Sequence, residues 1–145
     1  MNYPTKEEIL EEPLKIDSLI IEIITEWKKE FFKDWTSIAN KEKIIRLETL
    51  LYGIVTIFPF CEKNLKIDLG DQYCYDITKK TIYLDENNPS IISALHELGH
   101  HLFGRSELEA CRFSVGIFKK VFPEQYKKLV WERHMLVKNP NNIEQ

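Results

Sequence analysis

Two histidines four residues apart, His96 and His100, constrain the run from Ser93 to Gly104 more than any other feature of this chain. Residues four apart share one face of an α-helix, so a helix here would direct both imidazoles at one point. Zn²⁺ binds imidazole nitrogen at about 2.0–2.1 Å. Glu97 would lie beside such an ion as the general base for a metal-bound water, so it is the candidate catalytic residue.

A hydrolytic zinc site usually has three protein ligands and leaves its fourth position to water. Three downstream residues are candidates for the third ligand: Glu107, Glu109 and His134. Glu107 and Glu109 are two residues apart, so on one helix they face different directions. Glu109 can also complete a capping box with Ser106. We therefore prefer Glu107 as the ligand and keep the other two as alternatives.

Spacing excludes two other metal arrangements. His101 directly follows His100 and would point about 100° away around the helix, so it cannot easily share the same ion. The metzincin pattern needs a glycine three residues after the second histidine and a ligand three further on. Phe103 and Ser106 occupy those positions here.

A zinc hydrolase also needs a donor for the carbonyl oxygen of its substrate, and the candidates are His134, Tyr126 and Tyr83.

The length and composition are those of one globular domain. The chain has 145 residues, 43% of them hydrophobic, and we expect a domain over 1–138 and a disordered tail over 139–145. The net charge of −3 with no basic stripe argues against direct nucleic-acid binding. No apolar run approaches the roughly 20 residues of a membrane span. Three scattered cysteines and a polar N-terminus lead us to expect a reduced, cytoplasmic protein.

The first half of the chain predicts helices. Thr5 and Glu8 form a capping-box pattern, and Pro13 breaks the helix that they begin. Asp17 or Ser18 could cap a second helix, because apolar residues then recur at helical spacing. The apolar positions of that helix are Leu19, Ile20, Ile23, Ile24, Trp27 and Phe31.

The pattern between residues 40 and 84 changes from helix to strand. A third helix should begin at Asn40 and end at Gly53. Strands are predicted over Ile54–Phe60, Leu65–Leu69, Tyr73–Ile77 and Thr81–Leu84, which would give an antiparallel sheet of about three strands. If the last strand lies at an edge of the sheet, it could hold an extended peptide beside the metal.

The second half predicts two helices around the motif and one more at the end. Asn88 could cap the motif helix, with Pro89 at its first position and Phe103 near its end. Ser106 opens the next helix, and a last helix would run from about Pro123 to Val137. These elements together predict the α+β class, with N-terminal helices, a small sheet and a zinc-bearing helix pair.

Three runs of this sequence resemble the ImmA/IrrE metallopeptidases. They are Lys80–Asp85, Ala94–Gly104 and Glu107–Phe113, and they cover parts of the second half of the chain. Members of that family are compact gluzincins, zinc hydrolases whose third ligand is a glutamate from a later helix. The resemblance therefore implies a minimal gluzincin fold with a strand, an HExxH helix and a ligand-bearing helix.

The resemblance also implies the roles of individual residues. The zinc ligands would be His96, His100 and Glu107, and the catalytic base would be Glu97. Cys111 stands where the family usually has Asn or Asp, which is the position of a hydrogen-bonding partner for a metal-bound histidine.

The expected function is that of a zinc-dependent metallopeptidase. The resemblance implies a protein or peptide substrate, with helix-turn-helix repressors of phages or mobile elements as examples. Two alternatives stay open: a non-catalytic interaction protein of a phage or mobile element that keeps the zincin shape, and a zinc amidase acting on a small molecule. The intact Glu97 favours catalysis, because a scaffold does not need a general base.

Overall fold

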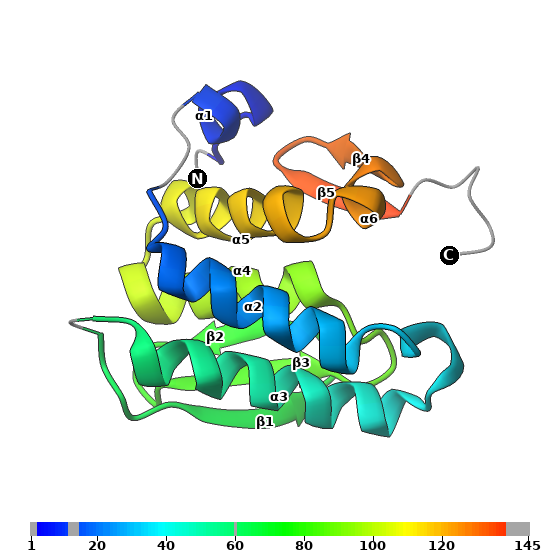
Figure 1. The fold of residues 1–145 in the computed structure, drawn as a ribbon. Helices are drawn as coiled ribbons and strands as arrows, with labels where there is room; N and C mark the ends of the chain where they lie inside the picture. The colour runs from blue at the N-terminus through cyan, green and yellow to red at the C-terminus, as the bar shows by residue number, and fades with distance from the viewer. Residues whose placement is uncertain (1–2, 12–14, 60, 139–145) are drawn as a thin grey trace.

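Helices stack over one small β-sheet in this protein (Figure 1). The structure is a computed structural model that describes residues 3–11, 15–59 and 61–138. It confirms the α+β class. The predicted break at Pro13, the end of the strand predicted up to Phe60 and the predicted tail over 139–145 lie outside the described residues.

The N-terminal helices begin where the sequence predicts. Helix α1 spans Lys6–Glu11, and the capping box is formed: Thr5 N–H donates to Glu8 Oε1 and Glu8 N–H donates to Thr5 Oγ1, both at 3.1 Å. Helix α2 spans Ser18–Phe31, and the carboxylate of Asp17 accepts from Leu19 N–H at 2.8 Å. Asp17 is therefore the cap.

Helix α3 is longer than predicted, because Gly53 does not end it. It spans Asn40–Ile57, and a short 3₁₀ helix, Trp35–Ser37, precedes it. The strand predicted from Ile54 is therefore wrong over residues 54–59, because α3 continues to Ile57 and a bend and a turn follow it. Ile54 and Val55 are buried and extend the apolar face of the helix. Burying them is worth about 1.5–3 kcal/mol each, which outweighs the cost of about 1 kcal/mol for one glycine in a helix.

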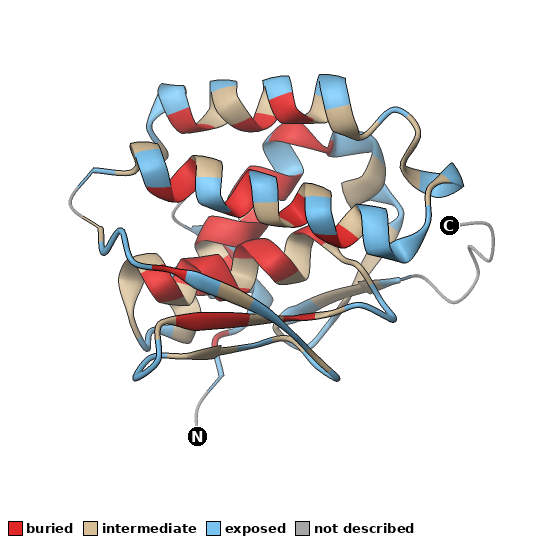
Figure 2. Ribbon diagram, turned by 90° about the horizontal axis from the view of Figure 1, so that it is seen from below, coloured by how far each residue is buried: buried red, intermediate tan, exposed pale blue. Residues whose placement is uncertain are grey.

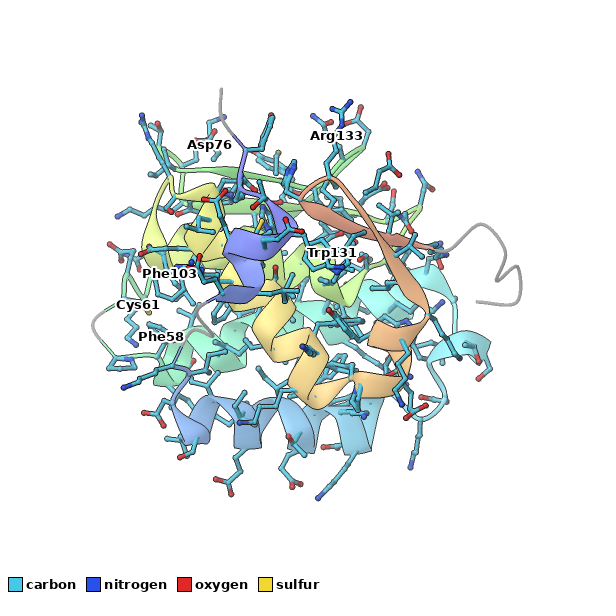
Figure 3. All side chains as sticks on the ribbon, turned by 90° about the horizontal axis from the view of Figure 1, so that it is seen from above. Phe58, Cys61, Asp76, Phe103, Trp131 and Arg133 are labelled. Carbon is cyan, nitrogen blue, oxygen red and sulfur yellow. The ribbon has the colours of Figure 1, made fainter. Side chains whose placement is uncertain are left out.

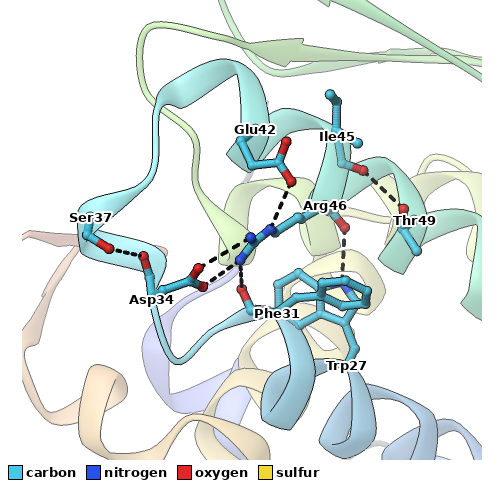
Figure 4. A network of polar contacts seen from close by, with 8 residues as sticks. All are labelled: Trp27, Phe31, Asp34, Ser37, Glu42, Ile45, Arg46 and Thr49. Carbon is cyan, nitrogen blue, oxygen red and sulfur yellow. Dashed lines mark hydrogen bonds and ion pairs between the residues drawn. The ribbon is translucent and has the colours of Figure 1, made fainter.

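An ion pair and hydrogen bonds around Arg46 join α2 to α3 (Figure 4). Its guanidinium donates to Asp34 Oδ1 at 2.6 Å and to the carbonyl of Phe31 at 2.8 Å. The backbone carbonyl of Arg46 accepts from the indole N–H of Trp27 at 3.0 Å. Arg46 thus ties the loop that follows α2 to α3 through Asp34, and Trp27 ties α2 itself to α3.

The described strands β1 (Lys66–Gly70), β2 (Cys74–Asp76) and β3 (Thr81–Asp85) form a sheet in the order β1-β3-β2. β2 pairs with β3 in antiparallel fashion as predicted, whereas β1 pairs with β3 in parallel. The prediction of a purely antiparallel sheet is therefore wrong. β3 is the central strand because it pairs with β1 and with β2, and its Ile82 and Leu84 are fully buried. It offers no free edge to a peptide, which corrects the edge-strand hypothesis for 81–84.

The motif helix α4 spans Ile91–Phe103 and begins later than predicted. Ser90 is its cap and accepts from Ser93 N–H at 3.2 Å. The phenol of Tyr73 explains the difference, because it donates to the carbonyl of Asn88 and accepts from Ser90 N–H, both at 2.8 Å. Asn88 is thereby held outside the helix. Gly104, with φ +85°, ends the helix as predicted.

Helix α5 spans Glu107–Val121 and is capped by Ser106 as predicted. The C-terminal helix is short, however: α6 spans only Pro123–Lys127, and strands β4 (Leu129–Glu132) and β5 (Met135–Lys138) follow as an antiparallel hairpin. The predicted helix over 123–137 is therefore confirmed from Pro123 to Lys127 and wrong beyond it. The hairpin is rich in β-branched and aromatic residues, which favour strands.

The core lies between the helices and the sheet. Helix α4 contacts β2 and β3 on one side and α5 on the other, while α2 contacts α3 and α5 (Figure 1). The buried positions line the inner faces of the helices and the central strand (Figure 2). At one end of the molecule the rings of Phe58 and Phe103 meet edge to face near Cys61 (Figure 3). Among the described helices, none is both long enough and apolar enough to cross a membrane.

Candidate metal centre

Close packing of α4 against α5 builds the candidate site. A Cβ atom at Gly99 would lie 2.9 Å from the Cα of Ala110, which is closer than real Cβ contacts come. Only glycine therefore permits this approach of the two helices. Gly99 lies one residue before His100, and Ala110 lies three residues after Glu107. The contact thus sets the distance between the two halves of the site.

The predicted ligands converge at this contact. Glu107 Oε1 lies 2.5 Å from His96 Nε2, and Glu107 Oε2 lies 3.3 Å from His100 Nε2. The two imidazole centroids are 5.0 Å apart, and the rings are nearly perpendicular. All three side chains are half-buried or more. The geometry is therefore that of two rings from one helix facing one carboxylate from the next.

A hydrogen bond to the carbonyl of Gly104 fixes which nitrogen of His100 carries the proton. His100 Nδ1 lies 2.9 Å from the carbonyl of Gly104, which can only accept, so Nδ1 carries the proton. In the neutral ring, Nε2 then presents a lone pair to Glu107. Two acceptors facing each other need a cation between them, either a proton or a metal ion. Accordingly, the hydrogen bond to Glu107 raises the pKa of His100, and the hydrogen bonds from His100 and His96 hold the pKa of Glu107 well below its usual range.

This donor set fits a zinc ion. Two ligands bound at about 2.0–2.1 Å in tetrahedral geometry lie roughly 3.3 Å from each other. The distance of 3.3 Å between His100 and Glu107 matches that separation, whereas 2.5 Å between His96 and Glu107 is too short for it. The carboxylate would have to move back from His96 when a metal binds. The carbonyl of Gly104 behind His100 is the kind of outer partner that orients metal-bound histidines.

Cys111 contacts the opposite side of His96. Its Sγ lies 3.8 Å from His96 Nδ1 and 3.9 Å from Glu107 Oε1. Ligand atoms of Cys111, His96 and Glu107 all lie within 4.8 Å of one another, so these three also form a set that could hold a metal. We prefer the set with His100, because the sulfur faces Nδ1, whereas the carboxylate faces Nε2. Burial also raises the pKa of Cys111 to about 12, so its thiol is neutral.

Glu97 lines the same pocket as His96 and Glu107. The pocket has a volume of about 400 Å³, and Glu97, His96, Glu107 and Cys111 all contribute to its wall. Glu97 is buried, and this burial raises the pKa of its carboxyl. The structure thus brings together the four residues predicted for the site: the ligands His96, His100 and Glu107, and Glu97 beside them.

The structure separates the other candidates from the ligands. Glu109 is exposed, and its backbone N–H, in the first turn of α5, donates to Ser106 Oγ at 3.2 Å; among the described ion pairs the histidines contact Glu107 and not Glu109. His101 is buried on the far side of α4, where its ring lies 2.8 Å from the phenol oxygen of Tyr75 and 2.7 Å from the carbonyl of Glu62. It anchors the chain before β1 to β2.

Of the three proposed oxyanion donors, His134 lines the pocket, whereas Tyr83 lies on the sheet and Tyr126 beside Lys119. Among the described residues no partner contacts His134 Nδ1, which is buried. The ring is stacked on that of Tyr3, with 4.4 Å between the centroids. The wall of the pocket therefore includes a histidine whose Nδ1 has no hydrogen-bond partner among the described residues.

Sequence reasoning missed the pocket walls formed by Tyr73, Met135 and Leu136. The predicted C-terminal helix concealed the last two. Val130 and Trp131, followed by Leu136 and Val137, carried a strand signal that could have revealed the hairpin.

The chain was compared with protein-family models, with curated proteins and with solved structures, and none of them matched.

Proposed function

We propose that this chain is a zinc-dependent metallopeptidase that hydrolyses peptide bonds of a protein or peptide substrate. One observation carries the proposal: His96 Nε2 and His100 Nε2 face the single carboxylate of Glu107, beside a pocket that contains Glu97. This arrangement requires a cation, and it occurs where the HExxH spacing predicts a zinc site. The resemblance to ImmA/IrrE proteins supports the same ligands and the same base.

The chemistry of the site follows from its charges. A zinc ion held by the three ligands would polarise a carbonyl and lower the pKa of a bound water to about 7. Glu97 accepts the proton of the attacking water on its carboxylate and then donates it to the leaving nitrogen. Its raised pKa suits both roles, because a general base works best when its pKa lies nearer the working pH.

His134 is the donor that we assign to the substrate's carbonyl oxygen. His134 is among the residues that line the pocket, whereas Tyr83 and Tyr126 are not. A donor held in place before the reaction stabilises the negative charge that develops on this oxygen. His134→Ala should lower kcat by about 10²-fold and leave zinc content unchanged. If His134→Ala lost zinc in the same proportion as it lost activity, His134 would have a structural role instead.

The resemblance makes a helix-turn-helix repressor the first protein substrate to test. The general test uses a peptide mixture that is made by digesting an unrelated protein. Mass spectrometry then identifies the new peptide termini that cleavage by this protein creates. Glu97→Gln should keep its zinc and cleave about 10²–10⁴-fold more slowly than wild type. Glu109→Gln is the control, because its side chain is exposed beside the site, and it should cleave at the wild-type rate.

The outcomes of this cleavage test distinguish between the candidate functions. Cleavage by Glu97→Gln at the wild-type rate would refute the general-base role. A zinc-loaded wild-type protein that cleaves no peptide and no repressor would instead support a non-catalytic interaction protein. The pocket of about 400 Å³ is also the size of a small-molecule site, which favours a zinc amidase as the second candidate. Faster hydrolysis of small acylated amino acids than of peptides would establish that alternative.

A further inference from the structure

A large apolar groove lies beside the candidate metal centre. It has a volume of about 1090 Å³ and runs between the start of α4 and the β4–β5 hairpin. We call it the hairpin groove and define it by Ile91, Ile92, Trp131, Met135, Leu136 and Val137. Trp131 lies over the body of the molecule, whereas Arg133 at the tip of the hairpin points outward (Figure 3). The groove is larger than most sites for small molecules, which occupy about 300–1,000 Å³.

The groove adjoins the pocket of the metal centre. Both are lined by the same five residues: Asn88, Ile92, Ser93, Met135 and Leu136. A chain bound in the groove would therefore run directly into the pocket that contains His96, Glu97 and Glu107. The shared wall places the groove next to the candidate metal centre.

The charges around the groove are mostly positive. Lys33, Lys128 and Lys138 line it and are exposed, and within the described part of the chain no ion pair involves any of them. Glu132 is the acidic residue of the described lining. Three lysines that have no ion-pair partner among the described residues therefore lie beside an apolar surface, and they favour an acidic partner.

Strand β5 can also bind a partner through its backbone. All of its residues, Met135–Lys138, line the groove, and β5 pairs with β4 on one side only in the described sheet. Alternate N–H and C=O groups of an antiparallel strand point away from its neighbour. They are available to an extended peptide that adds itself as a further strand.

We propose that the hairpin groove binds an extended polypeptide whose apolar side chains fill the groove and whose acidic residues contact Lys128 and Lys138. This inference rests on the proposed function, because it places the bond to be cleaved in the adjoining pocket. It identifies the substrate class as an unfolded or loosely folded protein segment with apolar residues bordered by acids.

The test measures binding separately from cleavage. Two fluorescein-labelled peptides serve as probes: one has a block of leucine, valine and phenylalanine bordered by aspartates, and the other has lysines in place of the aspartates. Fluorescence anisotropy gives the Kd of each for the zinc-loaded, full-length Glu97→Gln protein. The acidic probe should bind more tightly, and its preference should weaken as salt is added.

Charge reversal identifies the groove as the binding site. Lys128→Glu with Lys138→Glu should weaken binding of the acidic probe about tenfold, because two attractions become two repulsions. Lys15→Glu with Lys41→Glu is the matched control, with the same charge change on residues that do not line the groove, and it should change the Kd much less. Met135→Asp should weaken both probes, since it puts a charge into the apolar surface at an exposed position that tolerates it.

Three results would overturn the proposal: no binding of either probe, no preference for the acidic probe, or equal effects of the groove variants and the control. The proposed peptidase function can be refuted independently of the groove assignment. If the probes bind as expected but wild type cleaves no peptide, the groove assignment stands and the peptidase is refuted. If wild type cleaves peptides without regard to their acidic residues, the peptidase stands and the groove assignment is refuted.

Discussion

Replacing Gly99 with alanine tests whether the close contact between α4 and α5 builds the metal centre. The new Cβ would lie 2.9 Å from Ala110 Cα, and 3.2 Å from both the Cβ and the carbonyl oxygen of Ala110. Ordinary contact begins near 3.4 Å, so α5 has to move away by about 0.5 Å, the difference between these distances. The neighbour is backbone and cannot rotate aside. Glu107, on the first turn of α5, would move with it.

The change in the free energy of unfolding of Gly99→Ala follows from two opposing effects. Overpacking of this kind lowers the free energy of unfolding by about 1–3 kcal/mol. Alanine in place of glycine inside a helix raises it by up to about 1 kcal/mol. Gly53→Ala is the matched control, because it is also helical and no described atom lies within 4 Å of its Cβ. Both variants gain the same helix propensity, so Gly53→Ala should be more stable than Gly99→Ala by about 1–3 kcal/mol.

Urea unfolding of the metal-free proteins measures this difference, and competition with a chelator measures zinc affinity. Gly99→Ala should bind zinc about 10–100-fold more weakly, which is the usual effect of disturbing the support of a ligand. Gly53→Ala should bind zinc as wild type does. If Gly99→Ala matched Gly53→Ala in stability and kept its zinc affinity, the contact would not determine the geometry of the site.

Three further predictions concern stability. Ser90→Ala should cost about 1 kcal/mol in urea unfolding, whereas Asn88→Ala should cost less than about 0.5 kcal/mol; the reverse order would restore Asn88 as the cap of α4. Phe113→Ala should cost about 3–5 kcal/mol because Phe113 is fully buried, and a loss below about 1 kcal/mol would contradict its core position. In metal-free protein, Glu107→Gln should cost most stability between the ordinary pKa values of 4.5 for Glu and 6.5 for His. The pKa of His100 is raised, so its contribution is full below 6.5 and is lost as pH rises through the raised value. The pKa of Glu107 is lowered, so its contribution is present above 4.5 and is lost as pH falls through the lowered value; a cost independent of pH would refute this coupling.

Much of the fold was predictable because local signals agreed with packing. The caps at Thr5, Asp17 and Ser106 and the end at Gly104 are set by hydrogen bonds within a few residues, and all four are confirmed. The HExxH spacing also placed both imidazoles on one face, since four residues make about one helical turn.

The errors arose where distant contacts override local signals. Gly53 looks like a helix end, yet burial of Ile54 and Val55 carries α3 onward. The parallel pairing of β1 with β3 depends on how the chain crosses the sheet, which local alternation does not encode. The pocket walls from the β4–β5 hairpin depend on its packing beside α4 and α5, so they could not be read from the motif.

Zinc stoichiometry of purified variants tests the central claim most directly. The protein, prepared with zinc and freed of excess, should contain one equivalent by mass spectrometry of the metal. His96→Ala, His100→Ala and Glu107→Ala should each lose it, whereas Glu109→Ala and Cys111→Ala should keep it. Retention by Glu107→Ala, or loss by Cys111→Ala with retention by His100→Ala, would contradict the two-histidine, one-glutamate site.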